Sequence, residues 1–526
     1  MKSTHPFIIA AASFAIATSG YAAQLTGPSS SASPYVIASN PANTTVTSIL
    51  TVGDSVNNKP DGVTPYRMVG IPDGLGAYDN NDGTFTVLMN HELQGTAGVT
   101  RAHGAAGSFV SKWIINKNTF AAVNGSDLIQ NVSTWSTITS TYNAPATGVV
   151  LSRLCSADLA APSAYYNTGT GNGTQNRIFM SGEEIGPEGR AFGHVVTGPS
   201  AGTSYELPRL GKFSWENGVA NPGTGDKTVV LGTDDATPGQ VYMYVGTKTN
   251  SGSDVQKAGL TNGSLYGIKA GGVNPDRFES RTTGFDGASG NKDSVPFTLQ
   301  SLGNVENTTG AALQLNSANV GVTEFLRPED ITWDQNDVTK AYFVTTDRFD
   351  TGATVGASRL WEMDFADVND FTLGGTLKML IEGTGGADGQ MFDNLTMTSD
   401  GQLILQEDPG NQGYLAKTWS FDLADGTLTE LLVSDSDRFV LGNPGFLTQD
   451  EENSGVIEIT NIINDPSGQK YYLGVTQAHY GIAGELVEGG QMYVTAVPEP
   501  GTYALFGLSA LGLGGFIRHK RRKATL

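Results

Sequence analysis

The chain has 526 residues, of which 52 are acidic and 31 are Lys or Arg, so its formal net charge is −21 at pH 7. This balance excludes nucleic acid as a partner, because its phosphates would be repelled. The charge fits either solubility outside the cell or binding of divalent cations, which prefer carboxylate ligands. A single cysteine, Cys155, excludes an internal disulfide framework; its role is that of a buried thiol, a metal ligand or a reactive thiol.

The first 23 residues have the pattern of a secretory signal peptide. Lys2 gives a basic start, residues 7–17 form an apolar run, and small residues follow at Ala22 and Ala23. We therefore expect residues 1–23 to act in export and to take no part in the fold. The next stretch, residues 24–50, is rich in Ser, Thr and Asn, and we expect it to be loosely ordered.

Short strand-like runs recur along residues 24–496, rich in β-branched and aromatic residues and bounded by turn residues. The clearest are 85–89, 177–180, 241–245, 341–345, 402–405 and 471–475. Gly is abundant, with 68 residues, and helix-forming segments are few. No linker divides this body, so we predict one all-β domain, a β-propeller of about six blades. Long inserted loops, such as 167–176 and 283–296, would join the strands.

Acidic residues stand next to several of these strands, in short loop motifs. They are Glu92, Glu183, Glu184, Glu329, Asp330, Glu407 and Asp408. In a propeller, the loops at one end of the blades converge on a central channel, where carboxylates repel one another unless a cation lies between them. The recurrence of acids at strand ends therefore predicts a metal site in the channel, although any one acid alone fits an ordinary solvated turn better.

The C-terminus carries a short motif, an apolar run and a basic end, in that order. Pro498, Glu499 and Pro500 are followed by the apolar run 503–517 and by the basic cluster 518–523. Lys and Arg resist translocation and would hold this end in the cytoplasm. Residues 497–523 resemble the PEP-CTERM sorting signal of Gram-negative bacteria, with a plain single-pass anchor as the alternative.

The resemblance to this sorting signal has consequences for localisation. It implies that residues 497–526 anchor the protein transiently in the inner membrane, until an exosortase-type protease cuts near the Pro-Glu-Pro motif. The exported protein then passes to the outer surface or the extracellular matrix, where association with exopolysaccharide or the cell surface is expected.

Several short segments of the body occur in an order that is informative as a set. They are residues 70–77, 90–93, 153–156, 181–184, 207–211, 327–329, 392–395 and 406–411. Together they resemble the PhoX-type alkaline phosphatases, a family of secreted, metal-dependent β-propellers. The resemblance runs from about residue 65 to residue 485 and so covers most of the body.

This resemblance implies a calcium- and iron-dependent phosphatase that hydrolyses phosphate monoesters of small molecules in the propeller channel. It implies that Cys155 binds iron, which a soft thiolate suits, and that Arg327 contacts the phosphate through its forked guanidinium. The other implied metal ligands are Glu92, Glu183, Glu184, Glu329, Glu407, Asp408 and Asn411. Of Glu183 and Glu184, either can be the ligand.

Two other functions stay open, because a fold does not fix a function. One is a non-catalytic, calcium-stabilised surface or matrix scaffold. The other is a different hydrolase on the same scaffold, phytase-like or cleaving phosphodiesters. Cys155 together with Arg327 favours an enzyme over a scaffold, because a scaffold has no use for an iron thiolate beside a phosphate-binding arginine.

Overall fold

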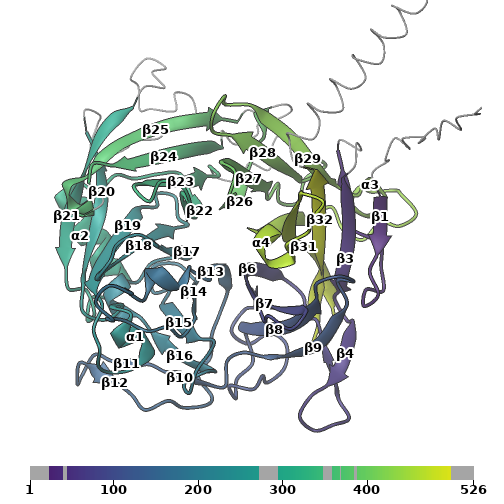
Figure 1. Ribbon diagram of the computed structural model, residues 1–526, viewed down its shortest axis with the longest axis horizontal. Helices are drawn as coiled ribbons and strands as arrows, with labels where there is room; N and C mark the ends of the chain where they lie inside the picture. Colours follow the sequence, from purple (N-terminus) through teal and green to yellow (C-terminus); the bar gives the residue numbers. More distant parts are fainter. Residues whose placement is uncertain are drawn as a thin grey trace, which may run out of the picture.

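The structure is a computed structural model that describes residues 23–39, 44–271, 294–347, 358–367, 369–383 and 388–498. Within these residues, a ring of inner strands surrounds a central channel (Figure 1). The ring consists of β6 (Pro72–Asp79), β13 (Leu154–Asp158), β17 (Trp215–Ala220), β22 (Pro328–Trp333), β26 (Phe392–Met397) and β30 (Glu451–Glu458). Each inner strand contacts the next, and β30 contacts β6, so the ring is closed.

Each inner strand begins a sheet, here called a blade, whose further strands follow antiparallel and outward. The first blade continues with β7 (Thr84–His91), β8 (Phe109–Asn116) and β9 (Ala122–Asp127). The second continues with β14 (Ile178–Glu183), β15 (Ala191–Val195) and β16 (Thr203–Glu206), and β10 (Asn131–Ser133) adds a parallel edge. This radial arrangement is that of a β-propeller, and it confirms the predicted all-β fold.

The blades of β17 and β22 join at their outer edges into one nine-stranded sheet. From β17 the sheet continues through β18 (Lys227–Asp234), β19 (Val241–Thr247), β20 (Ser264–Ala270) and β21 (Val295–Gly303). From β22 it continues through β23 (Lys340–Thr345), β24 (Arg359–Phe365) and β25 (Gly375–Glu382), and β25 pairs with β21. The remaining blades add β27 (Gln402–Glu407), β28 (Lys417–Asp422) and β29 (Leu428–Ser434) after β26, and β31 (Gln469–Ile482) and β32 (Val487–Pro498) after β30.

Residues 23–39 and 44–50 of the N-terminal stretch are ordered, so for these residues the expectation of a loose segment is wrong. The stretch supplies β1 (Ala23–Thr26), β2 (Val36–Ala38) and β3 (Thr45–Thr51). Strand β3 pairs antiparallel with β32, whereas β2 pairs with β29 of the preceding blade. Val46, Ile49 and Leu50 are fully buried there, and Thr is itself a strand-forming residue, so the polar composition concealed a strand.

The turn between β6 and β7 is built from residues that favour turn conformations. Between β6 and β7, Asn81 and Gly83 adopt positive φ angles of 60° and 89°, which Asn and Gly tolerate best. The Asp82 carboxylate accepts the Thr84 N–H at 2.9 Å and fixes the start of β7. Residues 80–83 thus form a hairpin turn between β6 and β7, and the strand-like runs of the sequence fall in β7, β14, β19, β23, β27 and β31.

Neighbouring blades pack face to face through apolar side chains, as stacked sheets do. Phe325 lies between two blades, with its ring centre 5.3 Å from that of Phe343 and 5.8 Å from that of Trp361. The first and last blades share a second core that includes Val87 and Leu473, both fully buried. This packing holds the inner ends of the blades rigid around the channel.

Short elements on the periphery complete the described residues. Two small hairpins pair β4 (Ser55–Asn58) with β5 (Pro65–Arg67) and β11 (Trp135–Ser136) with β12 (Thr141–Tyr142). The helices are α1 (Asp254–Lys257), α2 (Gly310–Val320), α3 (Ser436–Phe439) and α4 (Thr460–Ile463), with the 3₁₀ turns η1 (Pro162–Ala164), η2 (Pro208–Leu210) and η3 (Phe371–Leu373). Among these described helices, none is long and apolar enough to cross a membrane.

Three predicted segments lie wholly or largely outside the described residues. They are the signal peptide, of which residues 1–22 are not described, the 283–296 loop, of which residues 283–293 are not described, and the anchor, of which residues 499–526 are not described.

Candidate metal centre

Five inner strands carry a β-bulge near their first residues, where two residues of the inner strand stand opposite one residue of the next strand. The first residues of these bulges are Asp73, Cys155, Glu216, Glu329 and Asp393. A bulge re-aims side chains that would otherwise alternate between the two faces of the sheet. Since the bulged strands form the inner ring, the bulges bring these acids and the cysteine together at the channel.

Four groups of acidic residues and cysteine have ligand atoms within 4.8 Å of one another in the described residues. They are Asp73 with Glu92 and Cys155, Cys155 with Glu184 and Glu216, Glu216 with Glu329 and Asp393, and Asp393 with Asp408 and Glu452. Cys155, Glu216 and Asp393 each belong to two groups. The four groups therefore form one continuous array, here called the acidic cluster.

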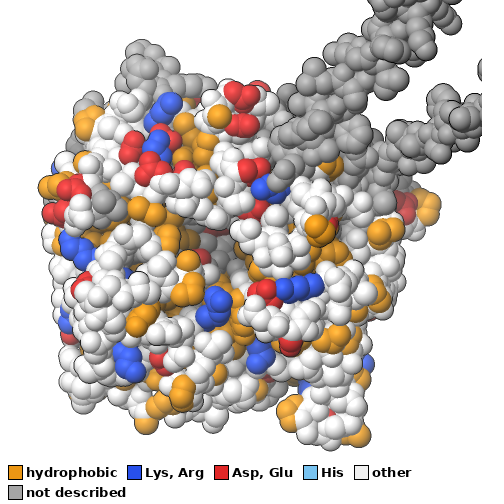
Figure 2. Space-filling view, in the orientation of Figure 1, with side chains coloured by type: hydrophobic (Ala, Val, Ile, Leu, Met, Phe, Trp, Pro, Cys, Tyr) orange, Lys and Arg blue, Asp and Glu red, His pale blue; other side chains and the backbone are white. Residues whose placement is uncertain are grey.

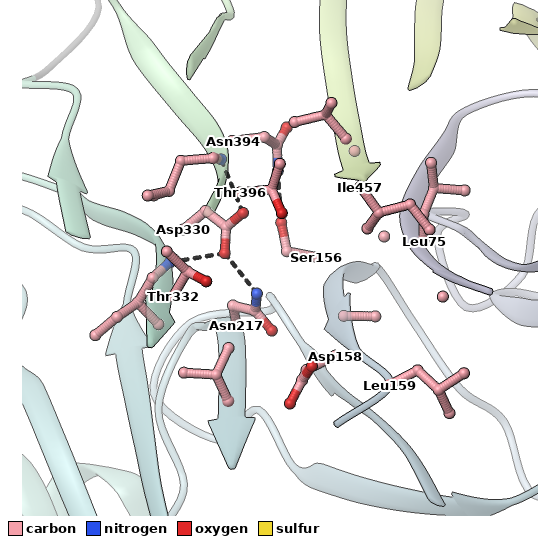
Figure 3. Close-up of a pocket in the computed structure, with 18 of the residues that line it drawn as sticks. Leu75, Ser156, Asp158, Leu159, Asn217, Asp330, Thr332, Asn394, Thr396 and Ile457 are labelled. Carbon is pink, nitrogen blue, oxygen red and sulfur yellow. Dashed lines mark hydrogen bonds between the residues drawn. The ribbon is translucent and has the colours of Figure 1, made fainter. Parts of the chain in front are cut away.

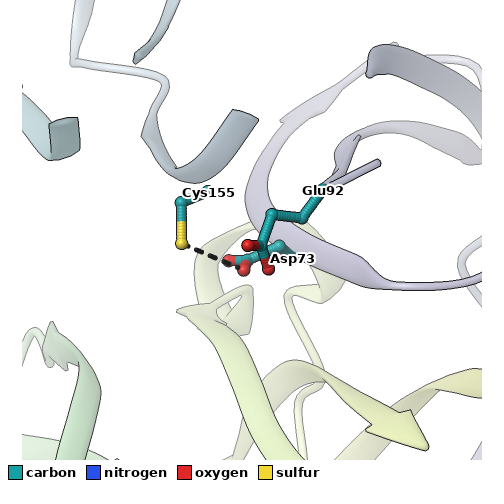
Figure 4. A group of neighbouring side chains, drawn as sticks. All are labelled: Asp73, Glu92 and Cys155. Carbon is teal, nitrogen blue, oxygen red and sulfur yellow. Dashed lines mark hydrogen bonds between the residues drawn. The ribbon is translucent and has the colours of Figure 1, made fainter. Parts of the chain in front are cut away.

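In the group around Cys155, carboxylate oxygens and the thiol lie close together and are buried (Figure 4). The Cys155 Sγ atom lies 3.4 Å from Asp73 Oδ2, and the Glu92 carboxylate lies against Asp73. The Gln477 Nε2 atom is 3.1 Å from Asp73 Oδ2 and 3.3 Å from Glu92 Oε2. Among the described residues, Asp73 Oδ1 and Gln477 Oε1 are buried without a hydrogen-bond donor. Two buried acceptor oxygens without donors suit a bound cation.

Burial, reinforced by repulsion between like charges, sets the electrostatics of the acidic cluster. Burial and neighbouring carboxylates raise the pKa of Asp73, Glu216 and Asp393 well above the usual carboxyl range. Burial, with the charge of Glu452, raises the pKa of Asp408 to about 7. Burial and the charge of Asp73 also raise the pKa of the Cys155 thiol. A cation would reverse these shifts, because positive charge stabilises carboxylate and thiolate.

Two arginines border the acidic cluster. The Arg327 Nε and Nη2 atoms donate to the two oxygens of Asp235 at 2.8 and 2.9 Å, and Nη2 lies 2.7 Å from Glu329. Burial favours the neutral form of Asp235, but the Arg327 guanidinium outweighs it and lowers the pKa of Asp235 below its usual value. The forked pair with Asp235 fixes the position of the Arg327 guanidinium at the edge of the cluster. The second arginine, Arg153, forms ion pairs with Glu92 and Glu184.

Five of the nine residues predicted from the sequence lie in the acidic cluster: Glu92, Cys155, Glu184, Glu329 and Asp408. Arg327 borders the cluster, whereas Glu183, Glu407 and Asn411 are not members of the groups. Glu183 pairs with Arg190 instead, through contacts of 2.6 and 2.8 Å. Glu407 accepts hydrogen bonds from the backbone N–H of Gln390 and the indole of Trp419, both at 2.8 Å.

Strand alternation explains which acid of each pair reaches the acidic cluster. Successive side chains of a strand point to opposite faces. Glu183 and Glu407 are the last residues of β14 and β27, and each is paired with the residue before a bulge. Glu184 and Asp408, one residue later, therefore lie on the other side and join the cluster. Asn411 lies further along the loop and is exposed.

The adjacent acids Glu183 and Glu184 offer a matched test. We expect Glu184→Gln to lower metal affinity by about 10- to 100-fold or more, because it removes a carboxylate from the cluster. Glu183→Gln should keep the metal content and lower stability by about 1–3 kcal/mol, since it weakens the ion pair with Arg190. Elemental analysis and thermal unfolding of both variants measure the two effects. Equal metal loss in both variants would contradict this assignment.

A cavity of about 220 Å³ lies in the channel beside the acidic cluster (Figure 3). It is lined by the second residues of the bulges, which are Gly74, Ser156, Asn217, Asp330 and Asn394. Ser156 Oγ donates to Glu216 at 2.6 Å and accepts from Asn394 Nδ2 at 2.6 Å. One layer of hydrogen-bonded side chains thus separates the cavity from the cluster. The molecular surface is hollowed at the centre of the ring on the face shown in Figure 2.

Comparisons with known proteins agree with this geometry. Residues 161–478 match the family model of alkaline phosphatase PhoX, and residues 496–522 match the PEP-CTERM protein-sorting motif. The family match spans more than half of the chain. The chain belongs to the PhoX family.

One solved structure shares the fold, and two others have TM-scores below 0.5. Pseudomonas fluorescens PhoX, solved with vanadate as a transition-state analogue, has a TM-score of 0.62 at 12% identity, over 91% of this chain and 98% of that chain. The Streptococcus pneumoniae sialidase NanB gives a TM-score of 0.40 at 8% identity, over 85% of this chain and 70% of its own. An arabinofuranosidase from Podospora anserina gives 0.32 at 9% identity, over 85% and 95%. No curated protein matches the chain.

Membership of the PhoX family confirms the prediction of a phosphatase and of metal dependence. The PEP-CTERM match confirms the C-terminal sorting signal and implies export. The acidic cluster offers ligand atoms at the centre of the ring that could hold a metal ion.

Sequence reasoning missed four members of the acidic cluster: Asp73, Glu216, Asp393 and Glu452. Each is the second residue of an inner strand, whereas the sequence motifs were sought in the loops next to strands. A repeated signal was present, because Ile-Pro-Asp-Gly at 71–74, Arg-Pro-Glu-Asp at 327–330 and Met-Phe-Asp-Asn at 391–394 share one pattern. In each, the first residue has a positive φ, of 50°, 55° and 51°, and the third is the acid of the bulge.

Proposed function

We propose that this protein is an exported phosphatase that hydrolyses phosphate monoesters of small molecules at the acidic cluster. The observation that carries the proposal is the shared membership of Cys155, Glu216 and Asp393 in overlapping ligand groups. Such overlap suits several ions close together in one channel. Cys155 would hold iron, since a thiolate is a soft ligand, and the carboxylates around it would hold calcium.

The protein residues have separable tasks in this proposal. Asp235 fixes the guanidinium of Arg327, which then offers N–H donors to the oxygens of a phosphoryl group. Gln477 keeps the Asp73 and Glu92 carboxylates in place through its Nε2 atom. The ions, when bound, would polarise the ester and neutralise the charge that develops on the phosphoryl oxygens.

Metal content and turnover test the proposal together. We expect the purified body, residues 24–496, to contain iron and calcium and to hydrolyse a phosphomonoester, with turnover lost on addition of a chelator.

Arg327→Ala should retain the metals but lose about 100-fold or more in kcat/KM, because a charged contact to the phosphoryl group is removed. Cys155→Ala should lose iron.

Other outcomes would redirect the assignment. Calcium alone, without turnover, would contradict the proposal and favour the scaffold. A substrate panel in which phosphodiesters are cleaved faster than monoesters would favour the other hydrolase. Full activity in a folded Cys155→Ala or Arg327→Ala variant would overturn the roles of these residues.

The location is part of the same proposal. We infer that the C-terminal segment anchors the protein transiently in the inner membrane and that an exosortase-type protease then releases it to the surface or the matrix. The PEP-CTERM match over residues 496–522 supports this route. Association with exopolysaccharide stays a prediction.

A further inference from the structure

Arg153 occupies the same place in its blade as Arg327 does in its own. Each arginine precedes the first residue of a bulge by two positions, Cys155 in one case and Glu329 in the other. Each also has a positive φ, 44° for Arg153 and 55° for Arg327, which is uncommon for a residue other than Gly. Ile71 and Met391, at the same position before their own bulges, share this positive φ, so the backbone turn belongs to the inner-strand motif and the arginine side chains distinguish these two blades.

The contacts of Arg153 hold its guanidinium over the acidic cluster. Its Nη2 atom lies 2.6 Å from Glu92 Oε1 and also contacts the Glu184 carboxylate. Its Nε atom donates to the backbone carbonyl of Glu184 at 2.9 Å. These contacts use Nε and Nη2, so within the described part of the chain Nη1 has no hydrogen-bond acceptor and can donate to a bound group. The side chain of Arg153 is 33% exposed, against 15% for Arg327.

The two arginines border the same part of the cluster. Glu184, the partner of Arg153, lies beside Asp235, the partner of Arg327. The order along this edge is therefore Arg153, Glu184, Asp235 and Arg327. In a protein with a net charge of −21, two fixed guanidiniums side by side with this array form a local site for an anion.

Bound cations would change the balance between the positive charge of Arg153 and the negative charges of Glu92 and Glu184. Without ions, Arg153 offsets the repulsion between Glu92 and Glu184, which belong to separate ligand groups. With ions bound, the cations neutralise these carboxylates. The guanidinium of Arg153 would then be available to pair with the negative charge of a bound anion at the edge of the cluster.

We propose that Arg153 is a second substrate-binding residue, which donates to the non-bridging oxygens of the phosphoryl group opposite Arg327. This inference rests on the proposed function. Two guanidiniums favour a dianionic phosphomonoester over a monoanionic diester, because the diester offers one charge and one fewer free oxygen. Arg153 is thereby a determinant of monoester specificity.

The test compares three variants of the metal-loaded protein, using inorganic phosphate as the probe. Arg153→Gln should raise the inhibition constant of phosphate and the KM of a monoester by about 10- to 100-fold, the usual worth of a charged hydrogen bond. Its turnover of a diester should change less, so the monoester-to-diester ratio falls. Arg153→Lys should recover part of the phosphate affinity, because it keeps the charge without the fork.

Arg190→Gln is the matched control, because Arg190 lies in the same blade and pairs with Glu183, outside the cluster. It should bind phosphate as the unaltered protein does. Elemental analysis of each variant separates substrate binding from metal retention. Unchanged phosphate inhibition in Arg153→Gln would overturn the proposal, as would metal loss in both Arg153 variants, which would make Arg153 a residue that positions the acids. Absence of metal and turnover in the unaltered protein would instead contradict the proposed function itself.

Discussion

Replacing Glu216 with Gln is expected to reduce bound metal and phosphatase turnover by about 100-fold or more, the largest effect of any single substitution. Glu216 belongs to two ligand groups, one with Cys155 and one with Glu329, and its side chain is 1% exposed. Gln has nearly the same shape, so the loss would come from the charge. Ser156 Oγ, which donates to Glu216 at 2.6 Å, can still bond to the amide oxygen.

Glu407→Gln provides the matched control for this substitution. Glu407 is also fully buried, but it accepts hydrogen bonds from Trp419 and from backbone N–H groups, and it lies outside the ligand groups. We expect this variant to be less stable and yet to keep its metal content and its turnover per folded molecule. Elemental analysis, turnover and circular dichroism distinguish the two variants. Full metal content and turnover in Glu216→Gln would show that the overlap of the ligand groups has no function.

The protein without its ions is expected to lose stability as the pH rises from about 4 to 8. Burial raises the pKa values of Asp73, Glu216 and Asp393, and the pKa of Asp408 reaches about 7. The folded chain therefore binds more protons than the unfolded chain in this range. The free energy of unfolding must then fall with rising pH, and the melting temperature should drop on the order of 10 °C.

Calcium should reverse this loss, because an ion that binds only the folded chain stabilises it by mass action. Thermal unfolding of chelated and calcium-loaded protein between pH 5 and pH 8 measures both effects. Asp393→Asn should flatten the pH dependence of the chelated protein, since Asp393 belongs to two ligand groups. Asp425→Asn removes the same charge from an exposed turn and should leave the slope unchanged. A melting temperature of the chelated protein that rises with pH would contradict the expectation.

The sequence predicts the fold from short, turn-bounded strands, because alternation and turn chemistry are local properties. It also predicts Glu92, Glu184 and Asp408, which follow strands directly. It could not separate Glu184 from Glu183, because that choice depends on the phase of strand alternation, which the register with the neighbouring strand fixes. Asp73 and Glu216 were missed because a bulge is a property of strand pairing and leaves only a faint pattern in the sequence.

Two further features could not be predicted because they depend on contacts between residues far apart in the sequence. Residues 24–50 form strands only because β29 and β32 provide partners. Glu452 joins the cluster because the last blade stands beside the first, where Gln477 contacts Asp73 across 404 positions of sequence. No local signal predicts such a contact.

The pairing of β3 with β32 brings the first and last parts of the described residues into one blade, next to the blade that holds Asp73 and Glu92. The ring cannot close, and the ion-binding array cannot be complete, until almost the whole polypeptide has been delivered to one compartment. Contacts so distant in sequence also form slowly. Ion uptake is therefore a late event in the maturation of the protein, and it occurs in the compartment where the last strand arrives. Under the proposed function, the phosphatase would gain its activity only after export, from metal ions that it meets outside the cell.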